Sequence, residues 1–218
     1  MQKFFHEIAN CPLFEGIAAA ELPALLEQFR AETKTYPRGS FLLRAGERRS
    51  TLGIVLSGAV QVQQEDYSGN NTLLAQLLPG DLFGEAFVCA GVPFTVSASA
   101  PQGAAVLWLA YQSLLAMDRA ATPAKTDVIG NLIRLLAGKN IFLTGRISHL
   151  SRRTLRDKVL SYLSEQSQRA GSRDFTIPMN RQALADFLAA DRSALSAVLC
   201  RLRDEGILRF YKNRFTFL

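Results

Sequence analysis

The sequence predicts an α+β chain made of an N-terminal β-roll, a long helix and a C-terminal winged helix-turn-helix. Three observations predict this order. Short apolar stretches separated by glycine turns fill residues 36–109, an apolar seam with helical spacing follows over 126–150, and two short helical patterns precede an alternating segment at the end. We therefore expect a β-roll domain with N-terminal helices over 1–124, a dimerisation helix over 125–150 and a winged helix-turn-helix domain over 151–218.

The composition is that of a folded globular protein. The chain has 218 residues, of which 48% are hydrophobic, and this excludes a disordered or collagen-like chain. Its apolar runs are shorter than the roughly 18 residues that a membrane span needs, and the N-terminal segment lacks an apolar signal core. The three cysteines are widely scattered, which excludes a disulfide framework and a C-x-x-C metal site. We expect a soluble, cytoplasmic protein that does not bind membranes.

The β-roll is predicted by period-two alternation between turns. Ile54 and Leu56, then Val60 and Val62, alternate with other residues, and Pro79-Gly80-Asp81 supplies a turn. Strands of this length with frequent reversals are typical of a roll of the double-stranded β-helix type.

The long helix is predicted by apolar residues that alternate steps of four and three. Such a narrow seam favours pairing with a second copy, and a single Asn in it is a known device for fixing register in a two-stranded coil. The alternative is a helix that packs on its own β-domain. The seam consists of Ile129, Ile133, Leu136, Asn140, Leu143, Ile147 and Leu150.

The last third of the chain predicts a helix over 152–168 and then a helix-turn-helix. Asn180 and Asp191 are plausible N-caps for two short amphipathic helices, with Ala189-Ala190 as the turn between them. The final segment alternates around Lys212-Asn213 as a β-hairpin, which in this position is a wing.

Charge is concentrated in the same region. Residues 1–150 carry 12 basic and 12 acidic side chains, whereas residues 151–218 carry 13 basic and 7 acidic ones. A compact basic module indicates a polyanion such as nucleic acid, because phosphate contacts need local charge.

This order of elements resembles the Crp/Fnr family of bacterial transcription regulators over nearly the whole chain. The most specific segments are RAGE (44–47), LSGAVQV (56–62), PGDLFGE (79–85) and RQALADFLAADRSALSAVLCRLRDEGIL (181–208). The resemblance implies a homodimer that binds double-stranded DNA at a near-palindromic operator and works with RNA polymerase. It also implies that the second helix of the helix-turn-helix enters the major groove.

The resemblance also assigns DNA-binding roles. Arg192 matches a family arginine near the start of the recognition helix, where it can read guanine or clamp a phosphate. Ser193 and Ala197 stand where the cyclic-AMP-responsive members have glutamate and arginine, so a different base sequence is expected. Ser196 is a second candidate for base contact. The expected phosphate contacts are Arg181, Lys212 and Arg214.

The expected effector pocket departs from the family pattern. In cyclic-nucleotide-binding relatives a Gly-Glu turn is followed by an arginine and a Ser/Thr that hold the cyclic phosphate. Gly84 and Glu85 match the turn and Thr95 can match the hydroxyl, but Phe94 stands in the arginine position, and residues 50–118 contain no Lys, Arg or His. A buried phosphate without a cation is costly, which disfavours cyclic AMP and cyclic GMP as effectors.

The aromatic residues of the roll predict an apolar cavity for a neutral or apolar small molecule, unless they are simply core. The proposed pocket residues are Gly84, Glu85, Phe94, Thr95, Phe83, Ile129 and Ile133. A cyclic-nucleotide-responsive regulator and an effector-independent DNA-binding protein are the alternatives. No cofactor or metal is expected, and no catalytic motif indicates an enzyme.

Overall fold

The structure is a computed structural model that describes residues 4–65, 71–116 and 122–218. The chain divides into two compact units, Met1–Gly138 and Lys139–Leu218, and the boundary falls inside the long helix α5 (Pro123–Leu150). We refer to these as the N-terminal unit and the C-terminal unit. Each has its own apolar core.

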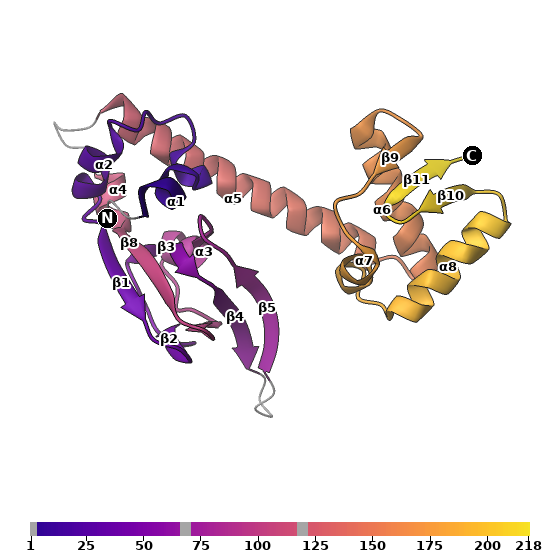
Figure 1. The fold of residues 1–218 in the computed structure, drawn as a ribbon, viewed down its shortest axis with the longest axis horizontal. Coiled ribbons are helices and arrows are strands. Elements are labelled where there is room, and N and C mark those ends of the chain that lie inside the picture. The colour runs from indigo at the N-terminus through magenta and orange to yellow at the C-terminus, as the bar shows by residue number, and fades with distance from the viewer. Residues whose placement is uncertain (1–3, 66–70, 117–121) are drawn as a thin grey trace. The chain divides into compact units, whose positions relative to one another are not determined.

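The N-terminal unit is built on a roll of two antiparallel sheets (Figure 1). One sheet has the order β1-β8-β3-β6 and the other the order β2-β7-β4-β5. The α+β class and the β-roll predicted from the sequence are confirmed. The strands are β1 (Glu32–Tyr36), β2 (Ser40–Leu43), β3 (Thr51–Gly58), β4 (Val60–Glu65), β5 (Asn71–Leu77), β6 (Leu82–Phe83), β7 (Ser97–Ala100) and β8 (Ala104–Ala110).

The central strand β3 is buried on both faces. Ile54, Val55 and Leu56 are all 1% exposed or less. The alternation expected around Ile54 and Leu56 therefore does not separate a solvent-exposed face of the strand from a buried one. Short helices contact β3 in addition to the strands that pair with it, so neither face of the strand is left to solvent.

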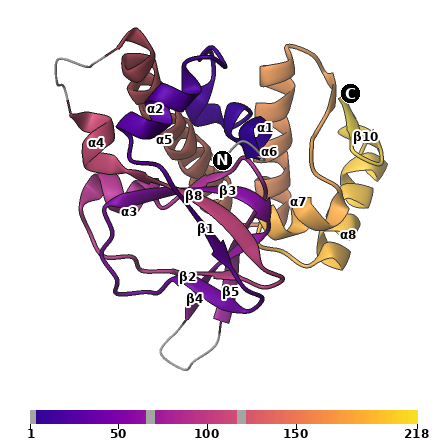
Figure 2. The same cartoon turned by 60° about the vertical axis from the view of Figure 1, so that its left-hand side comes forward.

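Short helices close the roll. Figure 2 shows α1 and α2 on the same side of the roll as the first turns of α5. Helix α3 was not predicted, since its sequence EAFVCA lies in a region that otherwise alternates like strands. The helices are α1 (Phe5–Ala9), the 3₁₀ helix η2 (Pro12–Phe14), α2 (Leu22–Gln28), α3 (Glu85–Ala90) and α4 (Tyr111–Leu115).

The first half of α5 packs on the N-terminal unit. Ala124, Val128 and Leu132 are buried in its core, and these positions form a face of α5 that lies beside the predicted seam. Asn131 is also buried, and its amide donates hydrogen bonds to Leu13 O (3.0 Å) and Glu15 O (2.9 Å). The helix is therefore fixed to its own domain by apolar packing and by a buried amide.

The C-terminal unit is a winged helix-turn-helix. Its wing is a three-stranded antiparallel sheet in the order β10-β11-β9, in which Tyr211 pairs with Arg214 across the predicted Lys212-Asn213 turn. The short strand β9 was not predicted. The elements are α6 (Leu155–Ala170), β9 (Asp174–Thr176), α7 (Arg181–Phe187), α8 (Arg192–Asp204), β10 (Leu208–Tyr211) and β11 (Arg214–Phe217).

Capping explains where these helices begin. The Asn180 side chain accepts from Ala183 N at 2.9 Å, as predicted for an N-cap. Helix α8 follows Asp191, but that side chain makes no capping bond. Helix α6 begins at Leu155 rather than 152, because Thr154 is its N-cap and accepts from Asp157 N at 3.1 Å.

Within the described ranges, no helix has the length and apolar character that crossing a membrane requires.

Candidate nucleic-acid interface and effector site

Buried leucines fix the rotation of α8 and so decide which face is exposed. Leu195, Leu199 and Leu202 are fully buried in the core of the C-terminal unit. Arg192 and Ser193 are exposed at the start of the helix. Ser196 is half-buried one turn later, and its hydroxyl donates to Arg192 O at 2.9 Å, which leaves its oxygen lone pairs available as acceptors.

The start of α8 borders an open hollow of about 660 Å³ between α7 and α8. Gln182 belongs to its lining and was not among the predicted site residues. Its amide donates to Asp186 Oδ1 at 2.9 Å, which presents a polar side chain from α7 beside Arg192. The hollow is lined by Gln182, Asp186, Ala190, Asp191, Arg192, Ser193 and Ser196.

Arg181 connects the start of α7 to the wing. Its guanidinium lies over the rings of Phe210 (5.1 Å to the centroid) and Phe215 (5.8 Å), and it donates to Lys212 O at 3.3 Å. Partial burial lowers the pKa of Arg181 from its ordinary value. In the free protein this side chain therefore supports the wing. A phosphate could bind only to those guanidinium N–H groups that do not already hydrogen-bond within the protein.

The other two predicted phosphate contacts on the wing, Lys212 and Arg214, differ in whether an acidic side chain already pairs with them. Lys212 is exposed at the tip, at a positive φ of 53°, and its ammonium lies 5.6 Å from the ring centre of Tyr211. Arg214 donates to Asp174 through Nε at 2.9 Å and through a second guanidinium nitrogen at 2.5 Å. This pairing lowers the pKa of Asp174, so the carboxylate stays ionised and competes with any phosphate for Arg214.

In the roll, the predicted Gly-Glu turn has a glycine at positive φ, and an aromatic ring packs against that glycine. Gly84 adopts a positive φ of 81° and precedes α3, whose first residue Glu85 is buried. The ring of Phe94 lies against Gly84, 3.4 Å from where a Cβ would be, and its centre lies 4.9 Å from that of the Phe87 ring in a tilted arrangement. An aromatic side chain therefore fills the space beside the turn.

The remaining predicted pocket residues are dispersed. Phe83 is buried and its ring meets Trp108 edge-on at 5.4 Å, while Thr95 is exposed. On α5, Ile129 is half-buried against the core and Ile133 is 62% exposed. Phe83, Phe94 and Trp108 are thus members of the apolar core.

Arg48 and Arg49 lie just before the segment 50–118, which contains no Lys, Arg or His. Arg49 pairs with Glu47 at 2.9 Å and lies 5.4 Å from the ring centre of Trp108. Arg48 donates to Gly91 O at 2.8 Å, at the end of α3. Both guanidinium groups already hold protein partners.

Comparison with known proteins identifies both halves of the chain. The model of the cyclic nucleotide-binding domain matches residues 33–119, and that of the Crp-like helix-turn-helix domain matches residues 157–218. The cyclic AMP receptor protein of Thermus thermophilus is 30% identical over 198 residues, which cover 91% of this chain and 88% of that relative. The chain belongs to the Crp/Fnr family of transcription regulators.

Two further relatives agree with this Crp/Fnr membership. The CRP-like cAMP-activated global transcriptional regulator of Mycobacterium tuberculosis is 23% identical over 211 residues, which cover 93% of this chain and 90% of the relative. The crystal structure of the Thermus thermophilus catabolite activator protein aligns with a TM-score of 0.50 and 26% identity, over 95% of this chain and 93% of that one. These relatives are regulators, and the chain is accordingly a regulator rather than an enzyme.

The predicted seam of this Crp/Fnr regulator contains both packed and exposed residues. Ile129 and Leu136 are half-buried against the core of the N-terminal unit. Leu143 and Ile147 are 53% and 66% exposed, and Asn140 is exposed and accepts from Thr144 Oγ1 at 3.2 Å. The seam thus retains exposed apolar residues, at Ile133 and over the second half of α5.

Proposed function

We propose that this Crp/Fnr regulator is a homodimer that binds a near-palindromic DNA operator through α8. The observation that carries the proposal is the exposed start of α8, where Arg192, Ser193 and Ser196 border a polar hollow while three leucines anchor the opposite face. A helix presented in this way fits the major groove, and a two-fold dimer would place two such helices roughly 34–36 Å apart.

The dimer is supported by the exposed apolar portion of the seam. Ile133, Leu143 and Ile147 each leave more than half of their side-chain surface to solvent. Apolar residues in a heptad-like register are the kind of surface that a second helix covers. RNA polymerase is the partner that a promoter-bound regulator of this family would contact.

The function is tested by selecting bound duplexes from a random pool with the full-length protein. Recovery of a two-fold related sequence supports the proposal, and the affinity for it should fall steeply with salt because phosphate contacts release counterions. A protein that binds no duplex at low salt would refute it.

Replacing Arg192 with alanine should reduce discrimination between the selected operator and single-base variants of it. We expect a loss of about 1 to 3 kcal/mol of discrimination at one base pair in each half-site, since a bidentate arginine–guanine contact supplies that amount. The measurement compares Kd values of wild type and R192A on the operator and on a set of single substitutions. Equal weakening on every sequence would show that Arg192 clamps a phosphate instead.

We propose that the effector is a neutral or apolar small molecule rather than a cyclic nucleotide. The ring of Phe94 lies beside Gly84, and Arg48 and Arg49, which lie just before β3 of the roll, are held by protein partners. An effector bound in the roll against α5 would act by shifting how the two long helices pair.

Calorimetric titration with cyclic AMP is therefore expected to give no saturable binding, with a Kd weaker than about 1 mM. The same lack of binding is expected for cyclic GMP. The cyclic AMP receptor protein of Thermus thermophilus, run under the same conditions, serves as the positive control. A micromolar Kd for cyclic AMP would reverse the proposal in favour of a cyclic-nucleotide-responsive regulator. Native mass spectrometry of the purified protein would detect a retained effector directly.

A further inference from the structure

The last turns of α5 are attached to the helix-turn-helix by polar contacts that the sequence did not reveal. Arg146 donates from Nε to Phe187 O at 3.2 Å and from a second guanidinium nitrogen to Asp186 O at 3.4 Å. Its guanidinium also lies 5.4 Å from the ring centre of Phe187. Both acceptors belong to the C-terminal end of α7.

This end of α7 needs such a donor. The last carbonyls of a helix lack partners within the helix, and they carry the negative end of its dipole. Some are satisfied by the turn itself: Leu188 N donates to Leu184 O, Ala190 N to Ala185 O and Ala189 N to Asp186 O, at 3.0 to 3.2 Å. Arg146 supplies a donor to Phe187 O, the last carbonyl of the helix, and brings a positive charge to it.

The turn that follows is under strain and leads directly into α8. Ala189 adopts a positive φ of 50°, a conformation that glycine usually provides at this position after a helix. Only Ala190 and Asp191 separate it from Arg192. The direction in which α8 leaves the turn therefore depends on interactions that hold the end of α7 in place.

Aromatic packing gives Arg146 a fixed position. The Phe187 ring lies 5.9 Å from that of Phe142 on α5 and 5.2 Å from that of Tyr162 on α6. His149, which is 4% exposed, hydrogen-bonds with Ser161 Oγ through Nδ1 at 2.9 Å and contacts Glu165 Oε2 through Nε2 at 2.8 Å. The end of α5 is thus joined to α6 by His149 and to α7 by Arg146.

We propose that Arg146 is a positioning residue for DNA recognition. Its guanidinium caps α7 and so fixes the 188–190 turn that aims the recognition helix, without touching DNA itself. The inference rests on the proposed function for its effect on operator binding, but its structural content concerns the free protein alone.

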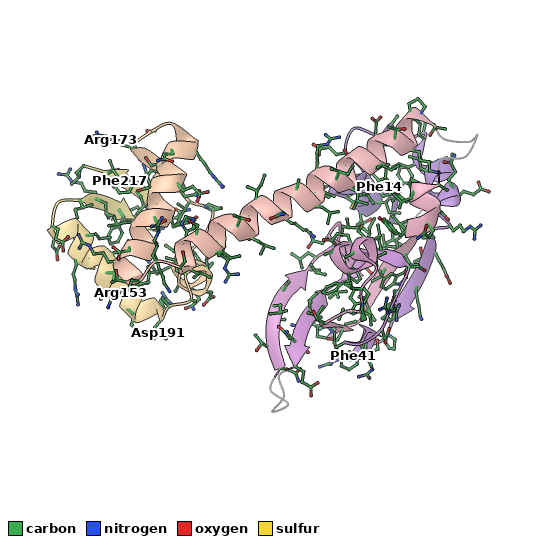
Figure 3. The ribbon with its side chains drawn as sticks, turned by 180° about the vertical axis from the view of Figure 1, so that it is seen from behind. Phe14, Phe41, Arg153, Arg173, Asp191 and Phe217 are labelled. Carbon is green, nitrogen blue, oxygen red and sulfur yellow. The ribbon has the colours of Figure 1, made fainter. Side chains whose placement is uncertain are left out.

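The test uses the full-length protein with R146A and R146K, and R173A as the control. Arg173 is exposed, its replacement by alanine removes the same charge as R146A, and Figure 3 shows it at the opposite end of the C-terminal unit from Asp191. Amide hydrogen exchange is followed at residues 188–190 and, as a reference, at the buried Leu163 on α6. Operator affinity is measured over a range of salt concentrations.

In R146A we expect the amides of 188–190 to exchange about 10-fold faster or more while Leu163 keeps its protection. Operator affinity should fall by about 2- to 30-fold, with an unchanged salt slope because no phosphate contact is lost. R146K, which keeps the charge but not the forked geometry, should lie between wild type and R146A, and R173A should match wild-type exchange.

Two results would overturn the inference. One is wild-type exchange at 188–190 in R146A. The other is a lost affinity accompanied by a smaller salt slope, which would make Arg146 a phosphate contact. If R146A does not fold, the exchange pattern of R146K decides. If the wild type binds no DNA, the proposed function fails, but the exchange data still test whether Arg146 holds the turn.

Discussion

Ile147→Glu is expected to convert the protein to a monomer and to weaken operator binding by on the order of 100-fold or more. Ile147 is 66% exposed and lies on the seam with Leu143 and Asn140. In a two-fold dimer the substitution would bring two carboxylates into an apolar interface, where an unpaired charge is costly to desolvate. A monomer reaches one half-site at a time and loses the gain in affinity that linked binding provides.

The measurement is molar mass in solution by light scattering at micromolar concentration, together with the Kd for the selected operator. Ile141→Glu is a closely matched control. Ile141 is 67% exposed on the same helix, but six residues away and therefore about 120° around the axis from Ile147. If I147E stays dimeric with wild-type affinity, or if I141E dissociates equally well, the seam is not the interface.

The two apolar faces of α5 show what periodicity could and could not predict. The seam is predictable because its steps of four and three produce a heptad pattern. The seam pattern does not identify the neighbouring face of Ala124, Val128 and Leu132, which anchors α5 to the N-terminal unit as in the alternative of a helix packed on its own β-domain. The pattern alone cannot separate two adjacent apolar stripes, because each residue is assigned to a partner only when the tertiary packing is known.

The helix-turn-helix was the most predictable part, because local chemistry defines it. The Asn180 cap and the Lys212-Asn213 turn both act within a few residues of themselves. Helix α6 begins three residues later than predicted, because Thr154 caps it and accepts from Asp157 N. That signal, a Thr followed three residues later by an acidic residue, was readable in the sequence.

Pairings between distant residues were not predictable in the same way. Arg214 and Asp174 are 40 residues apart, and Arg181 reaches Phe210 and Phe215 on the wing. The sequence therefore predicts Arg181 and Arg214 as phosphate contacts, whereas in the free protein both hold protein partners. Residue type indicated where a phosphate could bind, but only the fold shows which cations already have partners.

Gly58→Ala is expected to destabilise the N-terminal unit by about 3 kcal/mol or more. Gly58 ends β3 at a positive φ of 75°, and a Cβ there would lie 2.1 Å from Gly103 O and 3.1 Å from Ala104 Cα. These atoms belong to the backbone of the turn before β8 and of β8 itself, so a side-chain rotation cannot relieve the overlap. Since β3 pairs with β8 along its whole length, the clash affects the centre of the roll.

The fluorescence of Trp108 makes this prediction measurable in the intact chain. It is the only tryptophan of the sequence, it lies on β8 and it is 6% exposed, so its emission reports unfolding of the N-terminal unit alone. Gly138→Ala is the control, because Gly138 lies in α5 with no atom within 4 Å of a Cβ, and alanine there should stabilise the helix by up to about 1 kcal/mol. We expect G58A to lower the midpoint of the Trp108 transition in urea and G138A to raise or preserve it. If the urea midpoint of G58A equals that of the wild type, the backbone between β3 and β8 can shift to accommodate a methyl group, and the roll does not require glycine at position 58.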